Sequence, residues 1–461
     1  MRTRSGTRTR TRTRTGAGTL NARRPEAAVG SRAGSLNRCL GRTLLGLLAL
    51  LVVASCNRIE IAPDQEDGSG PDGALLERAA SGEVEAQLAA GRLYAELARE
   101  AEASSKTARR QAEALRWLTL AAEQENVEAQ TELGLLLAAK NTDLRNLAEA
   151  RRWLTRAGEA GDARALFASG ELVRDGEGGT PDPVKAVAYW RRATALGHPG
   201  AMHRLGEAYE QGLGVDHDLE QALAHYREAA DAGSAISQYR LAVLYDEGKL
   251  VPRDLVAAVK SYRQAAEQGY APAQAQLGYL YARGEGVIQR YDEAERWSRL
   301  AAEQGDADGC NNLAVLYLKG LGVEQSFDEA LRWYRLAAQR QHPGAQNMLG
   351  TIHLTGQGVE VDPNEAEHWW RMAAEQGYAA AQYNLGGMFS RDLSTTLSRE
   401  EALDWLGRAA AQGHRSAARE LAALQAVAAA TAEADDAEDP ARDSEASPAS
   451  GSAAAPLRTT L

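Results

Sequence analysis

The side chains that could do chemistry are eight histidines, three cysteines and a series of Gly-x-Gly pairs. The histidines show no HExxH or other metal-ligand spacing, so we expect no metal site and no cofactor. The Gly-x-Gly pairs lack the preceding strand and the following Lys-Ser/Thr that a phosphate loop requires, which favours tight turns between helices. The sequence therefore indicates no catalytic constellation, and we expect a protein that is not an enzyme.

An apolar segment that ends at Cys56 predicts how the chain is targeted. Residues 43–56 read TLLGLLALLVVASC, an uncharged apolar stretch that follows several arginines. A basic flank, a short apolar run and small residues at its end are the parts of a secretory signal, whereas a spanning helix needs about 20 apolar residues. We therefore expect residues 1–55 to be a signal peptide of the lipoprotein type.

The end of this segment, VASC at residues 53–56, resembles the bacterial lipobox, in which the cysteine thiolate takes a diacylglycerol. The resemblance implies that Cys56 is lipidated and holds the chain at the membrane of the bacterial cell envelope. Asn57 stands where Asp is the usual cue for the inner membrane, which implies the outer membrane, facing the periplasm. The alternative is an ordinary signal peptide with an incidental cysteine.

Charge is distributed unevenly along the chain. Residues 1–55 contain eleven Arg, no Lys and one acid, a net charge of +10. Because the whole chain carries −11, residues 56–461 carry −21. Nucleic-acid binding requires a basic face toward the phosphates, so this acidic body argues against a nucleic-acid partner. It favours a protein or peptide partner that is itself basic.

A repeat of 36 residues occupies most of the chain. A small residue, usually preceded by Leu, recurs at this spacing, and the series is Gly134, Gly170, Gly206, Ala242, Gly278, Ala314, Gly350, Gly386 and Ala422. An aromatic residue commonly follows three positions later, then a glycine turn, then a second segment that carries the tryptophans and closes on AAEQG-like ends. Such self-similarity is typical of repeat architectures.

The spacing predicts a helical hairpin in each repeat. Ala273, Leu277, Gly278 and Tyr281 share one helical face, where the small residue admits the second helix and its Trp or Tyr fills the remaining space. Ser326 with Glu329, and Ser398 with Glu401, have capping-box spacing at the start of second helices. One hairpin buries only part of its apolar surface, so neighbours must stack.

The pattern A-x-x-x-LG-x-x-Y-x-x-G-x-GV followed by A-x-x-W-[YWL]-x-x-AAEQG resembles the Sel1-like repeat, a relative of the tetratricopeptide repeat. The resemblance implies an all-α fold, a right-handed α/α solenoid of stacked helix-turn-helix repeats. We expect a flexible tether at 56–73, then about nine repeats plus a C-terminal capping helix at 74–430. Residues 431–461, acidic and rich in Ala, Ser and Pro, are expected to be a disordered tail.

Partner binding is predicted on the first helices, which usually line the inner face of such a solenoid. The two positions before the recurrent Leu vary between repeats, and they hold side chains that combine apolar area with adaptable hydrogen bonding. The candidate contact residues are His203, Arg204, Tyr239, Arg240, Gln276, Asn311, Asn312, Asn347, Met348, Tyr383 and Asn384. The alternative is that these are merely solvated positions.

Two function classes remain. The resemblance implies a non-catalytic protein-protein interaction scaffold or adaptor, tethered to the envelope by its lipid. The alternative is a protein that binds or hydrolyses β-lactams or peptidoglycan, like the cysteine-rich branch of the family. This chain lacks the cysteines of that branch and the Ser-x-x-Lys and Lys-Thr-Gly elements of serine β-lactamases, and hydrolysis of nitrocefin by the purified protein would distinguish the two classes.

Overall fold

A computed structural model describes residues 72–100, 105–140, 142–394 and 396–438. These residues form twenty α-helices and no strand, which confirms the predicted all-α class. None of these helices is long and apolar enough to cross a membrane. The expected signal peptide at 1–55 and Cys56 lie outside the described residues, as do nearly all of the expected tether and the last part of the expected tail.

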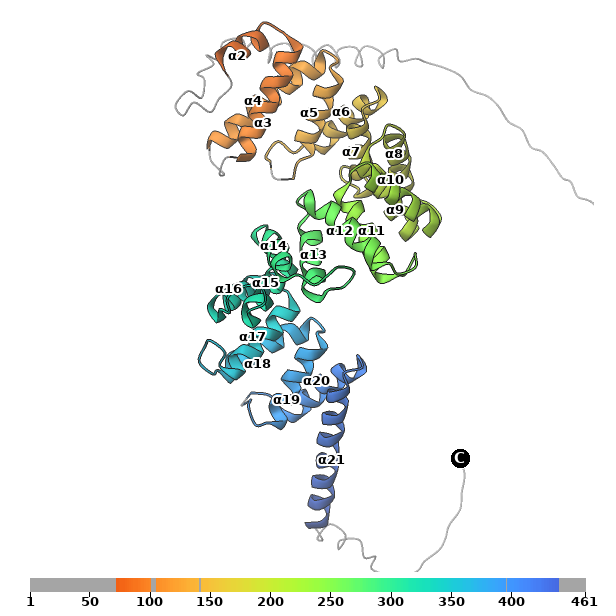
Figure 1. The fold of residues 1–461 in the computed structure, drawn as a ribbon. Coiled ribbons are helices and arrows are strands. Elements are labelled where there is room, and N and C mark those ends of the chain that lie inside the picture. Colours follow the sequence, from red (N-terminus) through yellow and green to blue (C-terminus); the bar gives the residue numbers. More distant parts are fainter. Residues whose placement is uncertain (1–71, 101–104, 141, 395, 439–461) are drawn as a thin grey trace, which may run out of the picture. The chain divides into compact units, whose positions relative to one another are not determined.

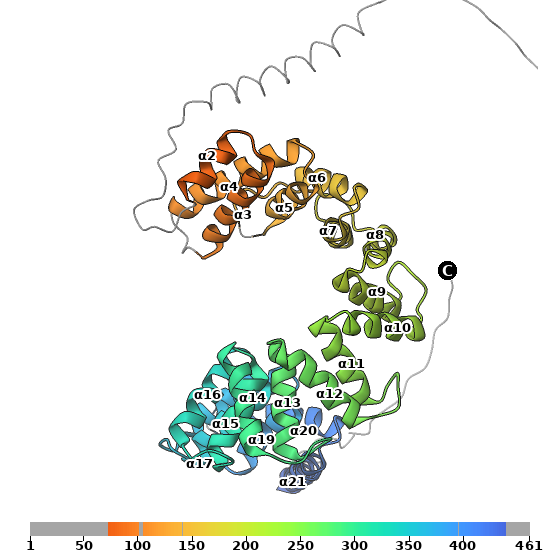
Figure 2. The same cartoon turned by 45° about the horizontal axis from the view of Figure 1, so that its top comes forward.

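The helices pair in chain order into nine hairpins, with α2 before them and α21 after them (Figures 1 and 2). Their bounds are α2 Gly73–Ala80, α3 Val84–Glu100, α4 Ser105–Glu123, α5 Val127–Ala138, α6 Leu147–Glu159, α7 Ala163–Arg174, α8 Pro183–Ala195, α9 Pro199–Gln211, α10 Leu219–Asp231, α11 Ala235–Glu247, α12 Leu255–Glu267, α13 Ala271–Arg283, α14 Tyr291–Glu303, α15 Ala307–Lys319, α16 Phe327–Gln339, α17 Pro343–Thr355, α18 Pro363–Glu375, α19 Ala379–Ser390, α20 Arg399–Ala411 and α21 Arg415–Glu438. Each helix packs on the next one along the chain, as expected for an α/α solenoid.

The capping helix is longer than the sequence predicted. We expected order to end at residue 430, but α21 continues to Glu438. The reason is the alanine-rich composition of residues 428–438, AAATAEADDAE, because alanine has the highest intrinsic helix propensity. The boundary predicted at residue 431 therefore falls inside a helix, and the rest of the expected tail lies outside the described residues.

A small residue on each first helix faces a buried side chain on its second helix. In most hairpins that partner is large, so the two helices approach closely and the ring or isobutyl group fills the space beside the small residue. The nine pairs are Gly91–Leu118, Gly134–Leu154, Gly170–Trp190, Gly206–Tyr226, Ala242–Tyr262, Gly278–Ser298, Ala314–Tyr334, Gly350–Trp370 and Gly386–Leu406.

The tryptophans occupy two neighbouring positions of the second helices. Trp190 and Trp370 are the large members of their pairs, and a Cβ added to Gly350 would lie 2.6 Å from the Trp370 ring. Most of the others, such as Trp333 and Trp369, stand one residue earlier and face the neighbouring part of the core. Because successive helical residues point about 100° apart, the two positions meet different surroundings.

The turns use glycine where the backbone requires it. Gly284 ends α13 with φ +70°, a left-handed conformation that glycine adopts without strain. Gly286, also at positive φ, lies so close to the Leu255 carbonyl that an added Cβ would be 2.6 Å from its oxygen. Among the predicted capping boxes, Ser398 and Glu401 form both reciprocal bonds, whereas the Ser326 side chain caps its helix alone.

Buried glutamines connect consecutive repeats. In six repeats a glutamine near the start of the first helix donates from Nε2 to an alanine carbonyl of the preceding helix, 3.0–3.2 Å away. In five of them its Oε1 accepts from a second glutamine at the end of the same repeat, at 2.6–2.8 Å. Gln346, for example, is fully buried between Ala338 and Gln376. These bonds satisfy polar groups inside the stack, where an unmade bond would be costly.

The adjacent tryptophans of α18 test which position holds a hairpin together. Trp370 is 2% exposed and donates from Nε1 to the Asn347 carbonyl at 3.0 Å, whereas Trp369 is half-buried. Trp370→Ala should lower the free energy of unfolding by about 3–5 kcal/mol, and Trp369→Ala by roughly half of that or less. Urea melts of the two variants measure the difference. Equal losses would show that the small–large pair contributes no more to the free energy of unfolding than the neighbouring position does.

Candidate functional site

The candidate site is the groove between the first helices of neighbouring repeats. Successive first helices contact each other directly, as α3 with α5, α5 with α7 and α13 with α15. Cavities lie in these grooves at equivalent places along the chain. All eight residues that line the cavity near Trp190 have a counterpart 108 residues later, or three repeats, in the lining of the cavity near Ser298. These two junctions therefore present the same groove with different side chains.

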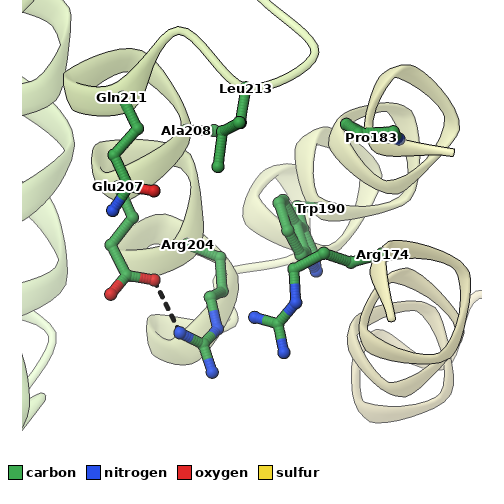
Figure 3. Close-up of a pocket in the computed structure, with 8 residues that line it drawn as sticks. All are labelled: Arg174, Pro183, Trp190, Arg204, Glu207, Ala208, Gln211 and Leu213. Carbon is green, nitrogen blue, oxygen red and sulfur yellow. Dashed lines mark hydrogen bonds and ion pairs between the residues drawn. The ribbon is translucent and has the colours of Figure 1, made fainter. Parts of the chain in front are cut away.

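The cavity between repeats three and four has a volume of about 290 Å³ (Figure 3). Trp190 of α8 lies against it, Arg174 enters from α7, and Arg204 and Glu207 come from α9. Arg174 and Glu207 lie in the second half of their first helices, a region that the sequence pattern did not single out, whereas Arg204 was among the predicted contacts. Comparing the lining positions across repeats would have found them, because they hold Ala, Asn and Val in the equivalent cavity three repeats later.

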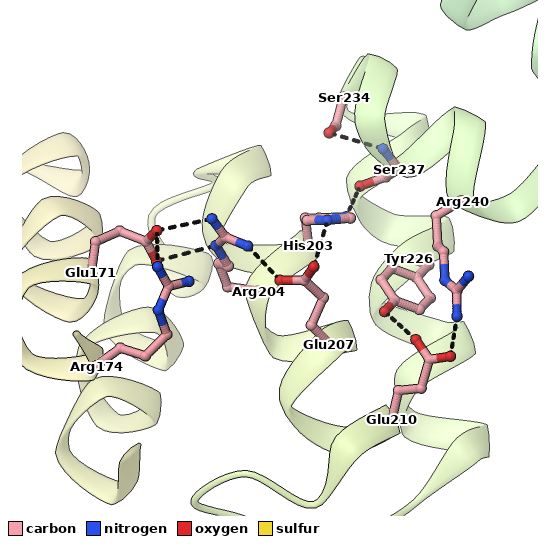
Figure 4. Close-up of polar contacts among 10 residues, drawn as sticks. All are labelled: Glu171, Arg174, His203, Arg204, Glu207, Glu210, Tyr226, Ser234, Ser237 and Arg240. Carbon is pink, nitrogen blue, oxygen red and sulfur yellow. Dashed lines mark hydrogen bonds and ion pairs between the residues drawn. The ribbon is translucent and has the colours of Figure 1, made fainter. Parts of the chain in front are cut away.

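The charges around this cavity are paired with one another (Figure 4). Arg204 forms a two-bond contact to Glu171 of the preceding repeat, with Nε to Oε1 at 3.1 Å and Nη2 to Oε2 at 2.9 Å. Arg204 Nη1 also donates to Glu207 at 2.6 Å, and Arg174 lies 3.2 Å from Glu171. Two-bond guanidinium–carboxylate contacts have fixed geometry, so this pairing sets how repeats three and four meet.

His203, a predicted partner contact, is buried. The side chain is 5% exposed, its Nδ1 lies 2.9 Å from the Ser237 hydroxyl of the next repeat, and its Nε2 lies 3.5 Å from Glu207. Its ring also lies 5.4 Å from the Tyr226 ring. The sequence suggested a contact surface because the residue at this position varies between repeats. In this repeat, however, the imidazole bridges two first helices and leaves almost no surface for a partner.

A second set of contacts joins repeats four and five. The Tyr226 hydroxyl donates to Glu210 at 2.6 Å, and Arg240 of the following repeat also donates to Glu210 (Figure 4). Arg240 was predicted to contact a partner, and its guanidinium is instead held by this carboxylate. Its side chain remains about one third exposed.

Three predicted amides also bond between repeats. Asn312 donates to the Ala275 carbonyl at 3.1 Å, and Asn384 donates to the Asn347 side chain at 2.9 Å. All three asparagines remain half-buried. The variable positions of the first helices are therefore not simply solvated, because they also carry bonds that set the spacing of the stack.

The other predicted contacts divide into packed and open side chains. Tyr239 packs on two tyrosine rings, Tyr383 stacks on a histidine ring at 4.6 Å, and Met348 lies against the core. Gln276 and Asn311 are half-buried, line a cavity and form no side-chain hydrogen bond with a described residue. The role of these residues in binding a partner stays a prediction.

The arginines and carboxylates that line the Trp190 cavity are held in ion pairs with one another. The nearest histidine–serine contact, between His203 and Ser237, joins two buried side chains. Within the described ranges, no three His, Cys, Asp or Glu side chains gather as metal ligands would. Cys310 is fully buried, and burial raises the pKa of its thiol, which keeps it in the unreactive protonated form.

Acid should weaken the Glu207 contacts. Although burial alone would raise the pKa of Glu207, hydrogen bonds from His203 and Arg204 lower it from 4.5 to about 2. The unfolded chain then binds more protons than the folded one between these values, so the stability that Glu207 contributes above about pH 4.5 is lost as the pH falls toward 2. Glu207→Gln should reduce the loss of stability between neutral and acidic solution by about 1–2 kcal/mol, with solvent screening included.

Urea melts at neutral pH and near pH 3 measure this effect in the natural protein and in the variant. Exposed Glu303→Gln is the matched control, because its side chain forms no ion pair with a described residue. If Glu207→Gln and Glu303→Gln change the acid sensitivity equally, the contacts of Glu207 do not stabilise the stack.

Comparison with known proteins assigns the repeat. The profile of the Sel1 repeat matches nine consecutive segments, at residues 109–126, 127–162, 163–198, 199–234, 235–270, 271–306, 307–342, 343–378 and 379–414. The matched segments end one residue beyond the repeat ends read from the sequence. The first segment covers only the second half of its hairpin, from residue 109 in α4 onward.

Two solved structures are similar over much of the chain. One is c5321, a protective antigen of uropathogenic Escherichia coli strains with an SLR fold, which is 30% identical, covers 76% of this chain and 73% of its own, and has a TM-score of 0.60. Another is a Sel1 repeat protein of Oxalobacter formigenes, 32% identical, covering 67% of this chain and 90% of its own, with a TM-score of 0.49. None of the curated proteins compared with the chain matches it. From the nine matched repeats and the helical hairpins that they form, the chain belongs to the Sel1 repeat family.

Proposed function

We propose that this protein is a non-catalytic scaffold that organises partner proteins in the bacterial cell envelope, to which a lipid on Cys56 tethers it. Sel1 repeat proteins generally mediate protein-protein interaction, and the family assignment supports the same class here. The observation that carries the proposal is the recurrence of one groove along the stack, lined at equivalent positions by side chains that differ from repeat to repeat.

A repeated groove suits recognition of an extended or helical segment. Cavities lie in the groove between repeats three and four and in the groove between repeats six and seven. Neighbouring grooves lie one repeat apart along the stack, so a partner can engage several in succession. The side chains around them combine aromatic surface, amides and paired charges, which are common at protein interfaces. The glutamine bonds between repeats preorganise this surface, which reduces the conformational entropy that is lost when a partner binds.

The location is inferred from the sequence. The apolar segment and the VASC end support export and lipidation of Cys56, and Asn57 supports the outer membrane, with the repeats facing the periplasm. The net charge of −21 on residues 56–461 favours a partner of basic overall charge, because long-range attraction would speed the encounter.

Photo-crosslinking in living cells maps the binding face whichever protein binds there. Replacing Gln276 or Asn311 by a photoreactive phenylalanine analogue in the full chain should give covalent protein adducts after irradiation. Both positions line an open cavity of the groove. Adducts are read as shifted bands on denaturing gels and then by mass spectrometry.

Glu303 and Glu375, which are exposed at the ends of second helices, are the matched positions for comparison. They should give few or no adducts. Strong adducts at these positions and none at the first helices would place the binding face on the second helices, and no adducts anywhere would contradict the scaffold proposal.

Lipid anchoring has its own test. Cys56→Ala removes the thiolate that would take the diacylglycerol, so the variant should move from the membrane fraction to the soluble or uncleaved precursor fraction. Incorporation of labelled palmitate into the natural protein, and its loss in Cys56→Ala, measures the modification directly. Equal labelling of the two proteins would contradict lipidation at this residue.

A further inference from the structure

Repeat six departs from the small–large rule of the other hairpins. Gly278 faces Ser298, so both members of the pair are small, whereas the equivalent second-helix residue in every other hairpin is Leu, Tyr or Trp. Ser298 is 1% exposed, and its hydroxyl forms no hydrogen bond with a described residue. A buried polar group without a partner is costly, so packing within the stack is incomplete at this position.

A cavity lies beside Ser298, between repeats six and seven. Its volume is about 370 Å³, compared with about 290 Å³ at the equivalent place where Trp190 stands. Ala282, Val315 and Leu321 give it largely apolar walls. For comparison, an apolar protein cavity of roughly 150 Å³ can hold a benzene molecule. The Ser298 cavity therefore has room for one large apolar side chain.

The cavity opens into a longer groove. A neighbouring cavity of about 270 Å³ shares Tyr279, Asn311 and Asn312 with it and continues to Asp308 and His342. Asn311 stands where the two meet, and its amide forms no side-chain hydrogen bond with a described residue. The groove follows α15, a helix of 13 residues and hence about 20 Å long, which matches about six residues of extended peptide.

The two ends of the groove differ in charge. Asp308 is paired with His342 at 3.0 Å, and Arg283 is paired with Glu285. Lys319, at the end beside the Ser298 cavity, is exposed and forms no ion pair with a described residue. A carboxylate is the group that would complement this ammonium.

We propose that the groove between repeats six and seven binds an extended peptide segment of a partner protein, which inserts one large apolar side chain beside Ser298 and places a carboxylate next to Lys319. The Asn311 amide bonds to the peptide backbone where the two cavities meet, on the side of the apolar anchor away from Lys319. The inference rests on the proposed scaffold function and names the segment that one groove recognises. The basic overall charge proposed for the partner acts at long range, whereas this carboxylate acts within a few ångström.

Ser298→Tyr tests the proposal because it restores the rule followed elsewhere. The same chain already accommodates tyrosine opposite glycine at Gly206 and Tyr226, so the variant should fold and fill the cavity. Ser298→Ala leaves the cavity open and is the control. A higher urea midpoint for Ser298→Tyr, with helical circular dichroism unchanged, would confirm that the ring enters the stack.

The probe is a phage-displayed library of random linear peptides, selected on the immobilised full chain and resynthesised for fluorescence polarisation. Selected peptides should share a large apolar residue near an acid, lose about tenfold or more in affinity with Ser298→Tyr, and keep their affinity with Ser298→Ala. Lys319→Gln should lower affinity about threefold and remove the preference for the acid.

Equal binding to natural protein and Ser298→Tyr, or the absence of any selected peptide, would overturn this inference. Such a result would leave the scaffold proposal standing if crosslinks form at Gln276, since that residue lines only the neighbouring cavity. Binding that is lost with Ser298→Tyr but is indifferent to the acid and to Lys319→Gln would overturn the carboxylate anchor alone.

Discussion

The contact on which the rest of this structure depends is that of a small residue with a large one, which is present in all of the described hairpins except the sixth. Glycine or alanine on the first helix lets the second helix approach until its Leu, Tyr or Trp lies against bare backbone. This approach brings the apolar faces of both helices within contact and leaves the far side of the first helix free to meet the next repeat. Because the pair recurs every 36 residues, a residue of the wrong size at one of these positions would disturb the contact between that hairpin and its neighbours.

The interfaces between repeats combine this packing with polar bonds of two kinds. Glutamine side chains donate to backbone carbonyls of the preceding repeat in a regular way. Ion pairs such as Arg204–Glu171 join two side chains at particular junctions. The regular bonds fix the spacing, whereas the individual ones distinguish one junction from another. The grooves thus acquire different linings without a change in the fold, which is the property that an interaction surface with several partners would need.

Much of the fold follows directly from the sequence, and less of the site does. The 36-residue spacing, the face shared by Leu277, Gly278 and Tyr281, and the glycine turns all reflect contacts within one hairpin, which sequence periodicity reports well. Contacts between hairpins are different, because the partner of His203 is Ser237 and that of Arg204 is Glu171, each more than thirty residues away. Periodicity shows that such positions vary, but not whether the variation serves a neighbour or a ligand. The gap at Ser298 is visible in the sequence only after the large member of each pair is known.

The glutamine bonds have a consequence for how such an array changes over evolutionary time. The acceptor in each bond is a main-chain carbonyl, which every repeat possesses whatever its side chains. A repeat that carries its own glutamine can therefore join a new upstream neighbour without a matching mutation there. Gene duplication or deletion of a unit bounded by two such glutamines would leave the regular bond in place at the new junction. Junctions that also depend on specific ion pairs, such as that of Arg204 with Glu171, lack this freedom, so lengthening and shortening of the array should concentrate at junctions held by glutamine alone.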